Sequence, residues 1–294
     1  MDENDWMAEQ FEASRNHLGA VAYRMLGSHS DADDAVQEAW FRLSRSDTSD
    51  VKNLRGWLTI VVSRVCLDML RSRRTRREEP LDAYVPDPIV DRDDSVDPEQ
   101  QTVLADSIGL ALLVVLEMLD PAERLSFVLH DMFAVSFDEI ATIVGRSPEA
   151  ARQLASRARR RVHGTDTVPD AGIAQQRAVV DAFFAASRTG DLQALIAVLD
   201  PDVVLRSDGG SRSPAATAVV RGAQAVASRA IMFSRPAAVL QPALVNGAAG
   251  VVVMLRDRPF SIMGFTIAGG RIVAIDVLAD PDRLVQIDLS RLAD

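Results

Sequence analysis

Apolar side chains recur every three or four residues through most of the first 163 positions, and this spacing predicts a series of amphipathic α-helices. The first helix is expected over residues 6–25 and ends at Gly27. Its apolar face consists of Phe11, Leu18, Val21, Ala22 and Met25. Asp31, a favoured N-cap residue, is predicted to begin a second helix that runs to Leu43. The same spacing predicts further helices over residues 54–74, 104–119, 121–132, 137–144 and 148–162.

The periodicity changes after residue 172, where two helices precede a set of strands. The helices are expected over residues 174–188 and 192–199. Alternating and β-branched runs predict strands over residues 203–206, 218–221, 239–245, 250–255, 260–267 and 271–278. Asn246-Gly247 and Gly269-Gly270 are residue pairs that favour tight β-hairpin turns. The C-terminal part is therefore predicted to be an α+β domain with a curved antiparallel sheet.

Charge divides the chain more sharply than its net value of −10 suggests. Residues 45–77 carry a net charge of +6 and residues 124–163 one of +3, whereas residues 78–123 between them carry −12. Residues 78–102 also contain four prolines, a composition that cannot bury a core. We therefore predict an acidic linker there and a short polar linker over residues 164–172. The domains on either side are expected at residues 1–77, 103–163 and 173–294.

Composition excludes several classes of protein. The longest apolar run, residues 108–116, is far shorter than the roughly 20 residues that a membrane helix needs. The N-terminus is acidic and lacks the apolar stretch of a signal peptide. The single cysteine, Cys66, excludes an internal disulfide and a multi-cysteine metal site. We therefore expect a cytoplasmic protein with no membrane partner, no metal and no cofactor.

Residues 136–161, SFDEIATIVGRSPEAARQLASRARRR, predict a helix, a turn at Gly145 and a second helix that begins at Ser147-Pro148. The second helix is expected to bury Ala150, Leu154 and Ala158. Its outward side would carry Arg152, Gln153, Ser156, Arg157, Arg159 and Arg160. Such a helix fits the major groove of DNA, where Arg and Gln read base edges and trailing arginines meet phosphates. The alternative is an ordinary helical hairpin with a solvated basic face.

These segments resemble a known family. Residues 31–43, DADDAVQEAWFRL, and 53–74, NLRGWLTIVVSRVCLDMLRSRR, are similar to region 2 of bacterial sigma factors of the extracytoplasmic-function class, and residues 119–161 are similar to region 4. Three short motifs resemble those of SigJ-type members, which carry a SnoaL-like C-terminal extension. They are Tyr84-Val85-Pro86-Asp87-Pro88-Ile89, Asp208-Gly209-Gly210-Ser211-Arg212 and Asp280-Pro281-Asp282-Arg283-Leu284. The resemblance implies two all-α sigma domains, a region 2 bundle and a region 4 helix-turn-helix, followed by an α+β cone domain of the SnoaL and NTF2-like type.

The resemblance also implies a promoter-specific transcription initiation factor that binds core RNA polymerase and promoter DNA. Docking to polymerase would use an acidic helix face, which could otherwise be a solvated helix start favoured by the helix dipole. Its members are Asp33, Asp34, Gln37 and Glu38. The −10 element would be held by Asn53, Arg55, Trp57, Arg64, Arg71, Arg73 and Arg74. Trp57 fits a core position equally well, and a solvated basic tail is the alternative for the arginines. The −35 element would be read by Arg152, Gln153, Ser156, Arg157 and Arg160.

The linker and the two C-terminal motifs are predicted to contact each other. Pro86 and Pro88 hold the linker extended, and Asp87 offers a carboxylate that Arg212 or Arg283 could pair with. The other expected contact residues are Tyr84, Asp208, Gly209, Gly210, Asp280, Pro281 and Asp282. We expect this contact to regulate the factor in cis, in response to a small ligand or a protein regulator. The alternative is a passive tether.

Enzymes also occur among SnoaL-like proteins, where cyclases use His-Asp pairs and isomerases use Asp with Tyr. Residues 164–294 contain no His, Glu, Cys, Tyr, Lys or Trp, so we expect no catalytic residue and no enzymatic activity. Two alternatives stay open: a ligand-responsive helix-turn-helix regulator, and a cyclase or isomerase fused to a DNA-binding module. A repressor would need neither the acidic helix nor the basic helix of residues 31–77.

Overall fold

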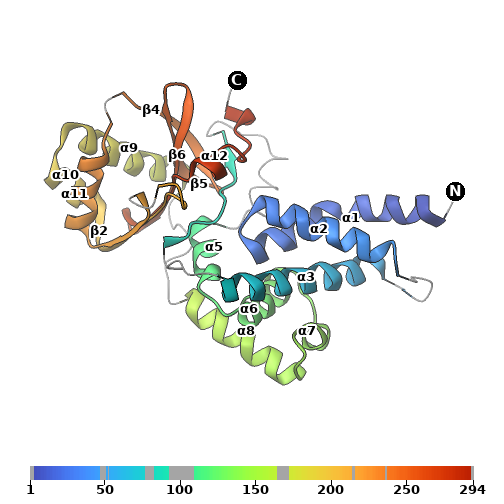
Figure 1. Cartoon of the computed structure of the whole chain (residues 1–294). Coiled ribbons are helices and arrows are strands. Elements are labelled where there is room, and N and C mark those ends of the chain that lie inside the picture. The colour runs from blue at the N-terminus through green and yellow to red at the C-terminus, as the bar shows by residue number, and fades with distance from the viewer. Residues whose placement is uncertain are drawn as a thin grey trace. The chain divides into compact units, whose positions relative to one another are not determined.

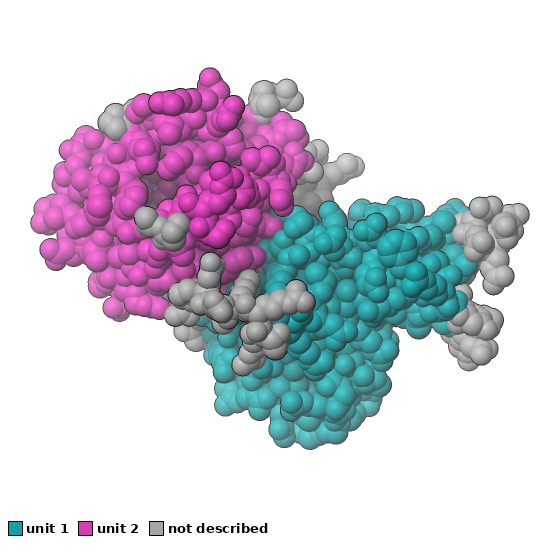
Figure 2. Space-filling model, in the orientation of Figure 1, with its two compact units in different colours: residues 1–79, 116–164 teal, residues 80–115, 165–294 magenta. Residues whose placement is uncertain are grey.

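The computed structural model describes residues 3–46, 51, 53–76, 83–92, 109–163, 172–213, 216–235 and 237–292. The chain divides into two compact units (Figure 2), which comprise residues 1–79 with 116–164 and residues 80–115 with 165–294. The first unit is helical, and the second combines helices with one sheet (Figure 1). The described part of the predicted linker, residues 83–92, lies in the second unit.

Three helices form the N-terminal half of the first unit and pack against one another. They are α1 (Glu3–Leu26), α2 (His29–Leu43) and α3 (Leu54–Arg76). The predicted apolar face of α1 is confirmed, since each of its five residues is at most 1% exposed. The predicted N-cap of α2 was wrong. Ser28 offers a capping oxygen three residues earlier and accepts a hydrogen bond from the Asp31 amide, while the Asp31 carboxylate forms an ion pair with Arg73.

The other half of the first unit contains the helix-turn-helix. Its elements are α6 (Pro121–Phe127), a π-helical turn η2 (Val128–Met132), α7 (Phe137–Val144) and α8 (Pro148–His163). Ser136 and Glu139 form a capping box at the start of α7, and Gly145 ends α7 in the left-handed conformation at φ 69°. Ser147 Oγ then accepts a hydrogen bond from the Ala150 amide at 3.2 Å, as its predicted capping role requires. The limits of α7 and α8 agree with the prediction to within one residue.

The second unit is built on a seven-stranded sheet in the order β1-β4-β5-β6-β7-β2-β3. The strands are β1 (Val90–Asp91), β2 (Leu199–Asp208), β3 (Ala218–Arg221), β4 (Val239–Val245), β5 (Ala248–Leu255), β6 (Arg258–Ala268) and β7 (Arg271–Leu278). The prediction of a purely antiparallel sheet was wrong for one pair, because β2 and β7 run parallel. A parallel pair needs a long crossover, and the segment between these strands supplies it. Both predicted hairpin turns are present, with positive φ at Asn246, Gly247, Gly269 and Gly270.

Helices cover one face of this sheet (Figure 1). They are α9 (Ile173–Thr189), α10 (Leu192–Val198) and α11 (Ala223–Phe233). Leu110, at the start of α5 (Leu110–Glu117), reaches Gly264 on β6. Two short helices, α12 (Pro281–Leu284) and the 3-10 turn η4 (Ser290–Leu292), follow β7. Among the helices that the structure describes, none combines the length and the apolarity needed to cross a membrane.

Candidate nucleic-acid interface and linker contact

The predicted acidic face is present on α2. Asp33, Asp34, Gln37 and Glu38 are all exposed, while the residues between them are buried against α1 and α3. Glu38 pairs with Arg42 one turn later at 3.0 Å, and both side chains are about half exposed. A helix held by its buried side presents three carboxylates and the Gln37 amide on one face, which a basic partner surface can complement.

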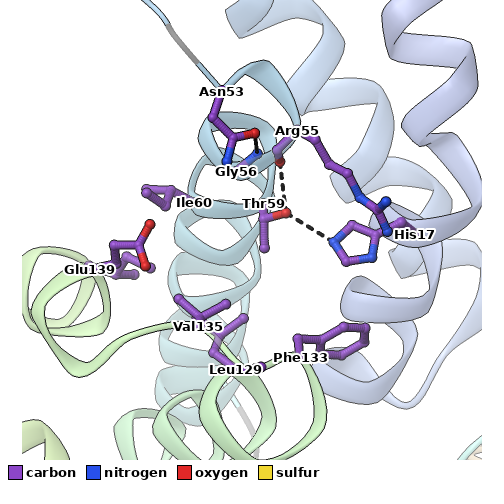
Figure 3. A pocket seen from close by; sticks show the side chains of 12 residues that line it. His17, Asn53, Arg55, Gly56, Thr59, Ile60, Leu129, Phe133, Val135 and Glu139 are labelled. Atoms are coloured by element: carbon purple, nitrogen blue, oxygen red, sulfur yellow. Dashed lines mark hydrogen bonds between the residues drawn. The ribbon is translucent and has the colours of Figure 1, made fainter.

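A cavity of about 310 Å³ lies beside the start of α3 (Figure 3). One wall consists of His17, Asn53, Arg55, Gly56, Thr59 and Ile60. The opposite wall consists of Leu129, Phe133, Ala134, Val135, Glu139 and Ile143. Two predicted −10 residues, Asn53 and Arg55, therefore line the cavity. Trp57 is half-buried and Arg64 is exposed.

Hydrogen bonds order the α3 wall of this cavity. Asn53 Oδ1 accepts a backbone hydrogen bond at 3.0 Å and so caps α3. Thr59 Oγ1 donates to the Arg55 carbonyl at 2.9 Å and lies 3.1 Å from His17 Nε2. Burial lowers the pKa of His17, and the charges of Arg55 and Arg24 lower it further. Both effects favour the neutral imidazole, and sequence reasoning missed the place of His17 at this wall.

The predicted phosphate-binding arginines of α3 differ in their surroundings. Arg64 and Arg71 are exposed. Arg73 pairs with Asp31 and donates to the Leu26 carbonyl at 3.0 Å, which ties α3 to the corner between α1 and α2. The side chain of Arg74 lies outside the described residues. Arg73 therefore has a structural role that its position in a basic run did not indicate.

The exposed side of α8 carries the predicted reading residues. Arg152, Gln153, Ser156, Arg157 and Arg160 are all exposed. The buried side consists of Ala151, Leu154, Ala155, Ala158 and Val162. Ala150 is only half-buried, so its predicted core position was wrong. Because α8 packs against both α6 and α7, its buried stripe is rotated by one residue toward Ala151.

Several arginines of α8 are paired within the unit. Arg157 and Arg161 both reach Glu123 of α6, at 2.7 and 3.0 Å. Arg159 pairs with Asp131 at 2.7 Å. The Glu123 side chain is only 8% exposed, so Arg157 also neutralises a nearly buried charge. Substitution of Arg157 would disturb the fold as well as any DNA contact.

The linker motif and the two C-terminal motifs converge on Arg283. Arg283 Nε donates to Asp87 Oδ1 at 2.8 Å, Nη1 donates to Asp208 Oδ2 at 2.8 Å, and Nη2 donates to the Val85 carbonyl at 2.6 Å. The guanidinium carbon lies 4.8 Å from the centre of the Tyr84 ring. Burial opposes the charge of Arg283, but Tyr84, Asp87 and Asp208 outweigh it and raise its pKa. We call Tyr84, Val85, Asp87, Asp208 and Arg283 the linker clasp.

A second contact holds the linker at Ile89, two residues after Asp87. The backbone N–H of Ile89 donates to the side-chain Oδ1 of Asn246 at 3.0 Å, and the backbone N–H of Asn246 donates to the Ile89 carbonyl at 2.8 Å. Val90–Asp91 then adds strand β1 to the edge of the sheet at β4. Asn246 was predicted only as a hairpin residue, yet its side chain also binds the linker. No local signal in the sequence indicates this second role.

The two C-terminal motifs also contact each other. Asp280 caps α12, and a side-chain carbon added at Gly210 would overlap the Asp280 carboxylate. Arg212 pairs with Asp282 at 2.8 Å, and both side chains are exposed. Of the two arginines predicted as partners of Asp87, the structure therefore selects Arg283.

One further ion pair is buried in the second unit. Arg206 Nη1 lies 3.3 Å from Asp276 Oδ1 on the neighbouring parallel strand. Burial raises the pKa of Asp276, and Arg206 opposes this shift. A carboxylate with a raised pKa could serve as a base. Residues 164–294 contain no His, Glu or Tyr, so none of these residue types in the same domain could form an acid-base pair with Asp276.

Residues 10–76 match the family described as Sigma-70 region 2, and residues 109–162 match the family described as Sigma-70, region 4. The chain is 40% identical over 290 residues to the ECF RNA polymerase sigma factor SigJ of Mycobacterium tuberculosis, with 93% of this chain and 92% of SigJ covered. This chain belongs to the extracytoplasmic-function sigma factors.

Two more similarities extend over the whole sigma factor. It is 38% identical over 285 residues to a protein of M. tuberculosis designated probable ECF RNA polymerase sigma factor SigI, with 97% of each chain covered. The crystal structure of M. tuberculosis SigJ matches it with a TM-score of 0.75 and 38% identity, covering 96% of this chain and 99% of that one. The similarity therefore includes the C-terminal domain as well as the two sigma regions.

Membership of the family confirms the predicted fold class and function. The sigma factor has helical region 2 and region 4 domains followed by an α+β domain, an arrangement that it shares with the crystal structure of SigJ. Its function is promoter-specific transcription initiation, and as a sigma factor it binds core RNA polymerase and promoter DNA. The two alternatives, a repressor and a fused cyclase or isomerase, are not favoured.

Proposed function

We propose that initiation by this sigma factor uses three separate surfaces and is regulated in cis by the linker clasp. The acidic face of α2 docks on basic residues of core RNA polymerase. The start and outer side of α3 hold the −10 element, with Asn53 and Arg55 at the cavity and Arg64 and Arg71 on phosphates. The exposed side of α8 reads the −35 element. Its reading residues are Arg152, Gln153, Ser156, Arg157 and Arg160.

The linker clasp is the observation that carries the regulatory part of the proposal. It joins groups 196 and 75 residues apart, and Asp87 and Asp208 are only 5% and 7% exposed. An ionised carboxylate loses its hydration on burial, and a paired cation with good hydrogen-bond geometry offsets that loss. Arg283 supplies the cation to both carboxylates. The linker is thus held by a specific site rather than by general apolar contact.

The linker clasp holds the segment that connects region 2 to region 4, so it can affect how both regions bind a promoter. Residues 77–109 connect α3 to α5, and a fully extended segment of 33 residues spans at most about 120 Å. The −10 and −35 elements lie about 25 base pairs apart, or about 85 Å along B-DNA. The segment can span this distance only if about three quarters of it is free to extend. A clasp on its middle therefore restricts how region 2 and region 4 can be placed on a promoter.

Regulation of promoter output then depends on which molecule binds the sigma factor with its linker docked and which binds it with the linker released. A small ligand or a protein that prefers one state shifts the population by its difference in affinity for the two states. We propose that the C-terminal domain acts in this way as a regulator without catalysis. We also propose that the factor works in the cytoplasm, where core RNA polymerase and DNA are found.

Run-off transcription with core RNA polymerase tests the proposal. Arg283→Met should change promoter output severalfold, because it leaves two carboxylates without their cation and releases the linker. The matched control is Arg212→Ala, which removes an exposed pair of the same domain and should leave output unchanged. Hydrogen exchange should rise at residues 84–91 in the first variant only. Faster exchange with unchanged output would make the clasp purely structural and refute its regulatory role.

A further inference from the structure

We propose that Phe137 is a positioning residue for base recognition, which holds the guanidinium of Arg152 in place for one −35 base pair while His130 supports the Phe137 ring. The inference rests on the proposed role of Arg152 as a −35 reading residue. It adds to that role a physical reason why this arginine of α8 can be specific for a base.

A hydrogen bond fixes the first ring of this group. His130 lies in the π-helical turn η2, and its Nδ1 lies 3.0 Å from the Val135 carbonyl oxygen. A carbonyl oxygen only accepts hydrogen bonds, so Nδ1 carries a proton and donates it. The backbone N–H of Val135 in turn donates to the Leu129 carbonyl at 2.9 Å, which brings the loop before α7 back to this helix. The His130 ring is therefore held in one orientation.

The Phe137 ring stacks on this imidazole. The two ring centres are 3.9 Å apart, and the ring planes differ by 28°. Phe137 is the first residue of α7, where the capping box of Ser136 and Glu139 fixes the backbone. The capped backbone and the stacked imidazole together define where the Phe137 ring lies.

Arg152 of α8 places its charge over the Phe137 ring. Its guanidinium carbon lies 5.2 Å from the ring centre, within the range of a cation–π attraction. Its Nη1 donates to Glu149 Oε2 at 2.6 Å. The attraction of the ring acts on the charge and occupies no N–H group. In the part of the chain that the structure describes, Nε and Nη2 of Arg152 have no hydrogen-bond partner, and the side chain is 57% exposed.

This arrangement leaves one edge of the guanidinium available to a base. Nε and Nη2 are two parallel donors, and guanine accepts such a pair at O6 and N7 in the major groove. An unrestrained arginine loses rotamer freedom when it binds, and this loss weakens binding. Arg152 has lost part of that freedom before it meets DNA, because the ring and Glu149 hold it. Specificity at this base pair therefore depends on Phe137 as well as on Arg152.

Other exposed arginines of α8 have different surroundings. Arg157 uses its Nε to pair with Glu123 at 2.7 Å, so one of the donors that a base would need is occupied. Arg160 has neither a ring nor a carboxylate as a partner among the described residues. An arginine of that kind suits a phosphate contact, which carries no sequence information. Arg152 differs from both because it combines a fixed position with a free donor edge.

Holoenzyme binding tests the inference with the full-length chain and core RNA polymerase. The DNA is a promoter that this holoenzyme transcribes, together with a panel that carries single base-pair changes in the −35 element. Discrimination is the ratio of the affinities for the unchanged and the changed promoter. Arg152→Ala identifies the base pair that Arg152 reads, where discrimination should fall by about 5- to 150-fold. Phe137→Leu should lose about two- to fivefold at the same base pair, whereas Phe137→Tyr keeps the ring and should retain discrimination.

Combined variants separate positioning from a structural role. In the Arg152→Ala background, Phe137→Leu should cause no further loss at that base pair, because no guanidinium remains for the ring to hold. Phe137→Met is a second ring-free variant with an adaptable side chain, and it should behave like Phe137→Leu. Arg160→Ala is the matched control, since it should weaken binding to every promoter of the panel equally. Thermal unfolding identifies which ring-free variant is folded.

Three outcomes would overturn the inference. Full discrimination in a folded ring-free variant, next to a clear loss in Arg152→Ala, would leave the reading role intact and remove the role of Phe137. An equal loss at every −35 base pair, or a loss that persists in the Arg152→Ala background, would make Phe137 a structural residue only. If Arg152→Ala lowers discrimination at no base pair, the proposed reading role itself fails, and the inference fails with it.

Discussion

Gly210→Ala should disrupt the linker clasp without touching any of its members. Gly210 has φ 65°, and a side-chain carbon there would overlap the Asp280 carboxylate. Asp280 caps the short helix α12, which carries Arg283. The left-handed backbone costs a non-glycine residue about 1–2 kcal/mol, and loss of the cap costs about 1 kcal/mol more. The total destabilisation of the second unit should be about 2–3 kcal/mol.

Gly270→Ala is the matched control, since Gly270 has φ 73° and nothing within 4 Å of an added carbon. It should cost only the backbone part, about 1–2 kcal/mol. The measurement is urea unfolding followed by hydrogen exchange in the second unit. Trp6, Trp40 and Trp57 all lie in the first unit, so their fluorescence should report an unchanged transition. Exchange at residues 84–91 should rise in Gly210→Ala beyond the control. Equal destabilisation in the two variants would refute the reasoning, because the overlap with Asp280 would then have no effect.

Three other predictions concern the first unit. Arg152→Ala should lose about 1–3 kcal/mol of discrimination at one −35 base pair. Arg160→Ala should instead weaken binding to all sequences and lower the salt dependence of binding. Binding titrations at several salt concentrations measure both effects. Charge reversal of Asp34 and Glu38 should reduce affinity for core polymerase in a pull-down and shift stability by under about 0.5 kcal/mol, since both are exposed; unchanged affinity would remove the docking surface from α2. Because the folded-state pKa of His17 is lowered, the unfolded state binds more protons, and stability should fall as the pH drops through about 6.5. His17→Gln should weaken this acid sensitivity in thermal unfolding, and an identical pH dependence would contradict the assigned burial.

Much of the fold follows from local sequence. The limits of α7, β3, β4 and β7 match the prediction, because apolar spacing, capping residues and glycine turns act over a few neighbouring positions. Other elements carry too weak a local signal. β1 has two residues and exists only because β4 offers an edge, and the Ala-rich α11 has little periodicity to detect. Short local motifs that follow one another in the expected order also identified the two sigma regions.

The tertiary structure alone decided which residues of a motif work together. Arg212 and Arg283 looked equivalent as partners of Asp87, yet Arg283 lies among buried carboxylates while Arg212 faces solvent. Arg73 and Arg157 looked like free basic side chains, but Asp31 and Glu123 engage them. These choices depend on burial, since an exposed charge needs no partner and a buried one must have it. The sequence determined which charges were available, and only the folded chain determined which of them lost water and had to pair.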